Sequence, residues 1–132
     1  MWVTVYAAQG LWRKEILYAI DHLERHLRGE LLKMMKWQVG FRNQFKVSTG
    51  KSQKHLLLYL TERQGTDLMM TYDLSGYDQC WKALFMMVRL FGETARDLAF
   101  KPGYAFVSEE EEKVTRHVKH ISELPDDETE IY

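Results

Sequence analysis

Two pairs of histidines stand at helical spacing, an arrangement that can hold a metal ion. His22 and His26 are four residues apart, and His117 and His120 are three apart. Neither pair forms the His-Glu-x-x-His pattern of zinc peptidases, whose glutamate acts as the general base. A metal would also need a third ligand, such as His55, to converge on a pair in space. We therefore predict no metal site and no cofactor, and we interpret both pairs as polar helix positions.

Other reactive groups also have structural explanations. The tripeptide Gly50-Lys51-Ser52 matches the end of a phosphate-binding loop, but that loop needs a glycine at position 45, where this chain has Phe45. We therefore interpret the tripeptide as a hairpin turn. Cys80 is the only cysteine, so it cannot form an internal disulfide, and we interpret it as a buried structural residue. Turn and cap chemistry explains the clustered carboxylates Asp67, Asp73 and Asp78, which lie near Glu62. We predict no catalytic residue, and an enzyme of unknown reaction is the third hypothesis.

The apolar pattern predicts the elements that position these residues. Alternation with β-branched or aromatic residues indicates strands, and steps of three and four indicate helices. The predicted strands are 2–7, 37–47, 56–60, 68–72 and 104–107, with a short helix as the alternative over 68–72. The predicted helices are 11–36, 76–99 and one that begins at 108, and a break at Gly29 is the alternative within the first of them. The order β-α-β-β-β-α-β-α favours an α+β fold, an antiparallel sheet of four to five strands with two main helices packed on one face and a short C-terminal helix. One domain would span residues 1–124, followed by an acidic tail at 125–132.

The charge is unevenly distributed along the chain. Residues 25–54 hold eight lysines and arginines against one carboxylate, although the formal net charge of the chain is −1. Such a stretch suits the phosphates of a nucleic acid. Proteins that stack bases present aromatic and cationic side chains together, whereas the predicted strand 37–47 places them on opposite faces. Nucleic-acid binding is therefore the second hypothesis, and its residues would be Arg25, Arg28, Arg42, Lys46, Lys51 and Lys54.

Two further features favour a protein partner. The predicted helix 76–99 is apolar on more than one face, and Met86 and Leu90 lie off its main stripe, where they would form a small exposed patch. The C-terminal region is acidic and would suit a basic partner. The expected partner-binding residues are Met86, Leu90, Glu109, Glu110, Glu112, Asp126 and Asp127. A homo-oligomer formed through the same helix is an alternative.

Length and composition narrow the function classes. The 132 residues suffice for one domain with a buried core, and no apolar run reaches the length of a membrane span. The N-terminus lacks the pattern of a secretory leader and the single cysteine suits a reducing compartment, so we expect a cytoplasmic protein. The leading hypothesis is a non-enzymatic protein-interaction module, such as a regulator or inhibitor of phage, plasmid or immunity type.

Overall fold

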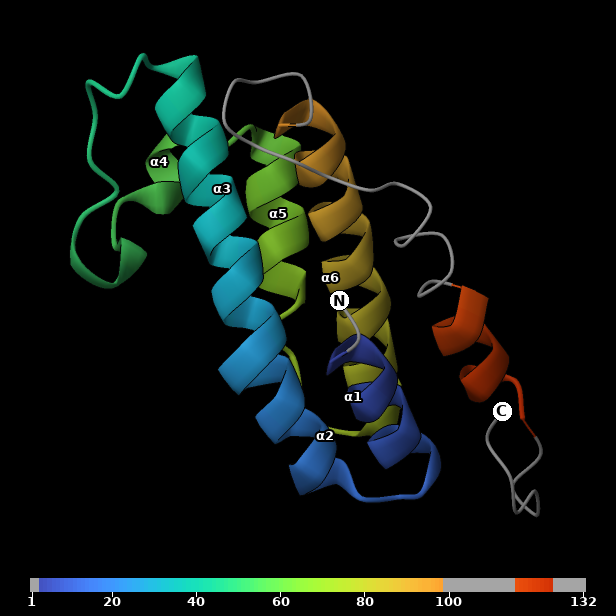
Figure 1. Cartoon of the computed structure of the whole chain (residues 1–132). Helices are drawn as coiled ribbons and strands as arrows, with labels where there is room; N and C mark the ends of the chain where they lie inside the picture. Colours follow the sequence, from blue (N-terminus) through green and yellow to red (C-terminus); the bar gives the residue numbers. More distant parts are fainter. Residues whose placement is uncertain (1–2, 99–115, 125–132) are drawn as a thin grey trace.

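The computed structural model describes residues 3–98 and 116–124, and the regular elements within these ranges are all helical (Figure 1). The α-helices are α1 (Val3–Trp12), α2 (Ile16–His22), α3 (Arg28–Arg42), α4 (Leu56–Tyr59), α5 (Glu62–Met70) and α6 (Tyr77–Leu98). A π-helical turn, η1 (Leu23–Leu27), joins α2 to α3, a 3-10 turn, η2 (Lys51–Gln53), precedes α4, and a further helix covers 116–122. The predicted α+β fold with an antiparallel sheet is therefore wrong.

Two strand predictions are wrong because apolar residues that pack inside the helical bundle give a sequence pattern resembling that of a strand. Residues 2–7 fall mostly within α1, where Thr4 and Val5 are buried, so these β-branched residues pack inside a helical bundle. The predicted strand 37–47 begins inside α3, which continues to Arg42. Burial against neighbouring helices therefore outweighs the intrinsic β preference of these residues.

The remaining predicted strands are also helical or lie outside the described ranges. The apolar run 56–60 folds into the single turn of α4, and 68–72 contains the end of α5. A capping box begins α5, because the Thr61 hydroxyl accepts from the Gln64 backbone N–H and the Gln64 side chain accepts from the Thr61 backbone N–H. The predicted strand 104–107 lies outside the described residues.

The segment from α2 through η1 to α3 is one long helical rod along one side of the molecule (Figure 1). In the π turn, the backbone N–H of Arg28 donates to the carbonyl of Leu23, five residues earlier. The predicted break at Gly29 does not occur, since α3 runs through it. The rod buries a series of side chains at steps of four, and each is at most 2% exposed: Leu23, Leu27, Leu31, Met35 and Val39.

Helix α6 lies at the centre of the bundle, where it packs against α1, α3 and α5 (Figure 1). The prediction of a helix over 76–99 is confirmed by the observed Tyr77–Leu98. Its apolar residues extend beyond one face because neighbouring helices cover several of its faces. Its buried side chains include Cys80, Leu84, Met87, Leu90, Ala95 and Leu98.

The described C-terminal helix joins the same core. Val118 and Ile121 are buried within the main apolar cluster, and the indole N–H of Trp12 donates to the carbonyl of Leu124 at 3.3 Å. The third predicted helix is thus confirmed over 116–122, whereas its expected start lies outside the described residues. None of the helices in the described ranges has both the length and the apolar character needed to cross a membrane. The division into a 1–124 domain and an acidic tail stays a prediction.

Candidate functional site

A pocket of about 460 Å³ opens beside the C-terminal end of α3. We call it the α3 pocket, and its lining residues are Lys33, Lys36, Trp37, Val39, Gly40, Phe45, Val47, Ser48 and Thr49. Lys33, Lys36 and Trp37 follow one another at steps of three and one, so the helix presents all three on its exposed side. Cationic and aromatic side chains therefore share one concave surface.

The aromatic wall of the pocket is held by the chain just after α3. The Asn43 side-chain N–H donates to the Val39 carbonyl at 2.9 Å, and the Phe45 backbone N–H donates to the Gly40 carbonyl at 2.7 Å. Gln44 and Phe45 both have positive φ, of 54° and 58°, which costs on the order of 1–3 kcal/mol for each such residue. This backbone folds the Phe45 ring back over α3.

Close packing on Gly40 fixes the position of that ring. A Cβ atom at position 40 would lie 2.5 Å from Phe45 Cε1, so any larger residue there would displace the ring. The ring centroid of Phe45 lies 5.8 Å from that of Trp37 and 5.1 Å from that of Phe41. Contacts within the chain therefore fix the position of the wall. Two lysines and two aromatic residues in one pocket lining suit a planar anionic ligand.

This arrangement corrects the expectation that aromatic and basic residues of 37–47 lie on opposite faces. That expectation assumed a strand, whereas the segment is the end of a helix followed by a tight reversal. Lys33, Lys36 and Trp37 were absent from the predicted sites. The buried residues from Leu23 to Val39 stand at steps of four, which continues the helical period past Gly29. This pattern could have shown that Lys33, Lys36 and Trp37 lie on the exposed side of the same helix.

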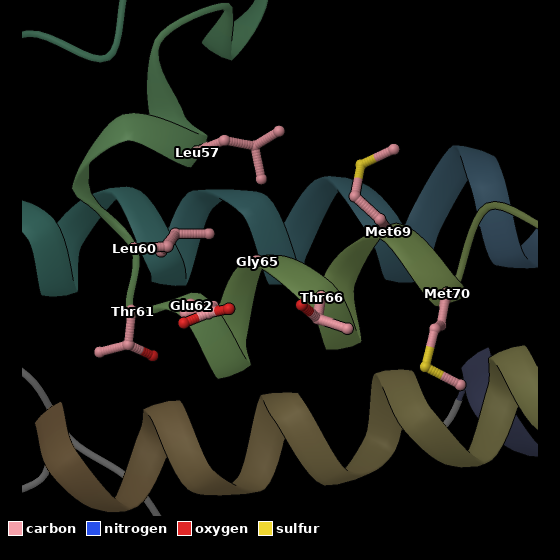
Figure 2. A pocket seen from close by; sticks show the side chains of 8 residues that line it. All are labelled: Leu57, Leu60, Thr61, Glu62, Gly65, Thr66, Met69 and Met70. Carbon is pink, nitrogen blue, oxygen red and sulfur yellow. The ribbon is translucent and has the colours of Figure 1, made fainter.

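A second hollow, of about 620 Å³, lies between α4 and α5 (Figure 2). We call it the α4–α5 groove; its lining residues are Leu57, Leu60, Thr61, Glu62, Gly65, Thr66, Met69 and Met70. Figure 2 shows Leu57 and Leu60 towards one end and the two methionines towards the other, with Gly65 between them. The groove is mainly apolar, and Glu62 is the charged residue of its lining.

Charged side chains behind this groove satisfy one another. The Asp67 carboxylate lies 2.9 Å from Arg89 Nη2 and 3.6 Å from Arg63 Nε, and Arg63 Nη2 lies 2.7 Å from Glu93. The hydrogen bond and charge of Glu93 raise the pKa of Arg63 above its ordinary value. These ion pairs join α5 to α6, so we assign the cluster a structural role rather than a chemical one.

Arg28, one of the predicted nucleic-acid-binding residues, is 5% exposed and does not reach solvent. Its Nη1 donates to Thr71 Oγ1 and its Nη2 to the Thr71 carbonyl, both at 2.8 Å. The guanidinium also pairs with Glu24 and lies 3.6 Å from the ring centroid of Tyr72. Arg28 therefore connects the start of α3 to the chain after α5.

The other basic residues of that prediction do not form one surface with Arg28. Arg25 pairs with Asp21 at 3.1 Å, and Arg42 donates to the Gln64 side chain at 3.0 Å. Exposed lysines follow along the chain between α3 and α4; they are Lys46, Lys51 and Lys54. Gly50-Lys51-Ser52 is not a hairpin turn between strands, because it leads into the 3-10 turn η2 and the short helix α4.

The predicted partner-binding residues Met86 and Leu90 do not form one exposed patch on α6. Leu90 is 1% exposed within the core, and Met86 is half-buried and packs against the core cluster. The expected surface position of Leu90 is therefore wrong, because helices cover α6 on the side that the sequence leaves apolar. The acidic members of the prediction lie outside the described residues: Glu109, Glu110, Glu112, Asp126 and Asp127.

The histidines and the cysteine occupy structural surroundings. The ring centroids of His22 and His26 lie 5.6 Å apart, and the His22 ring also contacts Tyr6 and Tyr18. Within residues 3–98 and 116–124, no three histidine, cysteine, aspartate or glutamate side chains gather closely enough to hold a metal ion. Cys80 is buried as predicted, and burial, together with the charge of Asp73, raises the pKa of its thiol.

Comparison with known protein families gives a match to streptomycin adenylyltransferase over residues 1–121. This chain belongs to that family. A relative from Bacillus subtilis (strain 168), an aminoglycoside 6-adenylyltransferase, is 34% identical over 119 residues, which cover 90% of this chain and 42% of the relative. A protein of the same name from Campylobacter jejuni is 36% identical over 115 residues, which cover 87% of this chain and 40% of the relative.

A solved structure shares the helical fold. The crystal structure of an aminoglycoside 6-adenyltransferase from Bacillus subtilis matches with a TM-score of 0.78 at 34% identity, over 92% of this chain and 46% of that chain. The chain thus spans less than half the length of these relatives. The leading hypothesis of a non-enzymatic interaction module, regulator or inhibitor is wrong, because the family and its relatives are adenylyltransferases. Contact with a nucleic acid is not tested by these comparisons and stays a prediction.

Proposed function

We propose that this chain forms the helical part of an adenylyltransferase that modifies an aminoglycoside. The observation that carries the proposal is the family match over residues 1–121. Three relatives named aminoglycoside 6-adenylyltransferase, 34–38% identical to this chain, support it. Because the match covers 42% of the Bacillus subtilis relative, the proposal gives this chain a share in the reaction rather than the whole of it.

The reaction sets the requirements on the site. A hydroxyl oxygen of the acceptor bonds to the α-phosphorus of ATP, the bond from that phosphorus to pyrophosphate breaks, and the hydroxyl proton passes to a base. Metal ions assist many such transfers by neutralising phosphate charge. Among the described residues, no three histidine, cysteine, aspartate or glutamate side chains lie together as potential ligands. We therefore derive no step through a metal on this chain.

Binding of the nucleotide is the share that we assign to the α3 pocket. The ammonium groups of Lys33 and Lys36 would face the phosphates, and the rings of Trp37 and Phe45 would contact the adenine. The support is the shared position of these four side chains in one pocket and the fixed placement of Phe45 on Gly40. Ligand affinity gains when a binding surface is already ordered.

A chimera tests the proposed function. The matched part of the Bacillus subtilis relative is replaced by this chain, and pyrophosphate release from ATP is measured with and without streptomycin. We expect streptomycin-dependent release. A chimera that unfolds cooperatively on heating but releases no pyrophosphate in either condition would contradict the proposal.

Charge reversal within the chimera tests the nucleotide site. We expect Lys33→Glu with Lys36→Glu to raise the KM for ATP about tenfold or more, which corresponds to about 1.4 kcal/mol or more of lost binding. The matched control is Lys51→Glu with Lys54→Glu, which makes the same charge change outside the pocket lining. Equal KM values for the two double variants would refute the nucleotide assignment.

A further inference from the structure

We propose that the α4–α5 groove is the docking surface for the portion of the adenylyltransferase that this chain does not match. The inference rests on the proposed function, because the relatives define the occupant. It assigns the groove one role, an interface between two portions of the same enzyme.

The groove is part of a continuous apolar surface. Leu57, Met69 and Met70 are 50%, 53% and 55% exposed. Leu57 and Met69 also line a hollow of about 180 Å³ that reaches Tyr72, and Met70 also lines one of about 350 Å³ that reaches Met86. The three hollows therefore adjoin along one side of α5. Large exposed apolar patches of this kind mark contact surfaces in soluble proteins.

Exposed aromatic residues elsewhere in the described chain already have partners within it. Tyr6 and Tyr18 contact His22, Trp37 and Phe45 contact each other, and Tyr72 lies under Arg28. The exposed aliphatic side chains of the described residues are Leu17, Leu57, Leu58, Met69 and Met70. Three of these five line the α4–α5 groove, so exposed aliphatic surface concentrates there.

The borders of the groove resemble those of a protein interface, in which an apolar centre is surrounded by polar groups. Thr61, Glu62 and Thr66 stand among the lining residues, and Arg89 lines the adjoining hollow. The centre at Gly65 is open, since Leu57 Cδ2 would be the nearest atom to a Cβ there, at 3.7 Å. Methionine side chains adapt their shape to a partner at little cost.

The lengths of the relatives identify the occupant. This chain covers 46% of the Bacillus subtilis crystal chain, so more than half of that chain lies outside the match. Two portions of one chain commonly share an interface of about 600–1,500 Å². The α4–α5 groove and its two adjoining hollows form the apolar face on which such a portion would seat.

Thiol protection tests the docking surface. Cys80 is buried with a raised thiol pKa, so Met69→Cys or Met70→Cys adds the one readily accessible thiol of the described chain. Alkylation of the added cysteine is followed by peptide mass spectrometry, in this chain alone and in the chimera. Leu17→Cys is the matched control, because Leu17 is 79% exposed on α2 and lines none of the three hollows.

We expect both groove thiols to react about tenfold or more slowly in the chimera than in the chain alone, with the Leu17→Cys rate unchanged. Equal rates in the two proteins would overturn the inference. So would slow reaction in the chain alone, which would show that the chain covers its own groove. Pyrophosphate release by the same chimera reports on the proposed function separately: an active chimera with unprotected groove thiols refutes only the docking surface, and an inactive chimera with protected thiols refutes only the function.

Discussion

Replacing Arg28 with methionine removes one charge from the interior while keeping a side chain of similar length. In the folded chain the guanidinium donates two hydrogen bonds to Thr71 at 2.8 Å, pairs with Glu24 and lies over Tyr72. The contacts reach from the beginning of α3 to the residues after α5, 43 positions along the chain. The variant therefore measures how firmly α5 is attached to the long helical rod.

The contacts to Thr71 dominate the expected loss. A hydrogen bond from a charged donor contributes about 1.5–3 kcal/mol, and both bonds to Thr71 are buried. Glu24 is 39% exposed, so its ion pair contributes at most about 1 kcal/mol, and the contact with Tyr72 contributes about 0.5–1 kcal/mol. Because such contributions overlap, we expect Arg28→Met to lower the free energy of unfolding by about 3–5 kcal/mol.

Urea unfolding followed by circular dichroism measures this loss. With a slope of about 2 kcal/mol per M, the midpoint of Arg28→Met should fall by roughly 2 M. Arg28→Lys keeps the charge but lacks the planar fork, so it should recover only part of the loss. In a double-mutant cycle with Thr71→Val, we expect a coupling energy of about 1 kcal/mol or more. A loss below about 1 kcal/mol, or additive effects of the two substitutions, would refute this account of the buried arginine.

Three further predictions concern glycines and the thiol. Gly29→Ala should raise the free energy of unfolding by about 1 kcal/mol in urea melts, because a Cβ there meets nothing within 4 Å and alanine favours the helix; an unchanged midpoint would contradict this. Gly40→Ala should raise the free energy of unfolding by about 1–2 kcal/mol less than Gly29→Ala does, because its Cβ displaces the Phe45 ring. The displacement should also change the environment of the Trp37 indole, as seen by NMR. Equal increases in the free energy of unfolding would show that the ring moves freely. Burial raises the pKa of the Cys80 thiol in the folded chain above its ordinary value of about 8.5. The resulting contribution to folding stability is fully present below about pH 8.5, and it is lost as the pH rises through the higher pKa of the folded state. Urea midpoints should therefore fall above pH 8.5 by more in the parent than in Cys80→Ala, and parallel pH profiles would argue against it.

The three helices predicted from the sequence each overlap helices of the structure, whereas α1, α4 and the end of α5 were predicted as strands. The helix over 76–99 was found from its apolar stripe, and Cys80 was interpreted as buried because it lies beside Trp81 and Leu84 on the apolar side of that helix. These predictions hold because α6 contacts three other helices, so its apolar pattern is strong and continuous. The core positions Leu23, Leu27 and Leu31 also lie on the stripe predicted for the first long helix.

The sheet was predicted because short apolar runs do not separate strand from helix by periodicity alone. The run 56–60 ends directly before Thr61 and Gln64, whose capping box begins α5, and this signal indicates a helix start rather than a turn between strands. The burial of Arg28 could not be predicted, because it depends on Thr71 and Tyr72, which are distant in sequence. The α3 pocket required knowing that the chain reverses at Gln44 and Phe45, where no glycine marks the positive φ angles.

The π turn between α2 and α3 holds one residue more than a regular α-helical turn. Each residue of a helix advances by about 100° around its axis, so an extra residue in a regular helix would turn every later position away from its face. Here the backbone N–H of Arg28 donates to the carbonyl of Leu23, five residues earlier, so Leu23–Leu27 takes up the extra residue. After deletion of one exposed residue within this turn, the same N–H would meet a carbonyl four residues earlier, and Arg28 and the lysines of the α3 pocket would keep their faces. The rod should therefore tolerate that deletion, whereas a deletion within α3 would rotate every position after it.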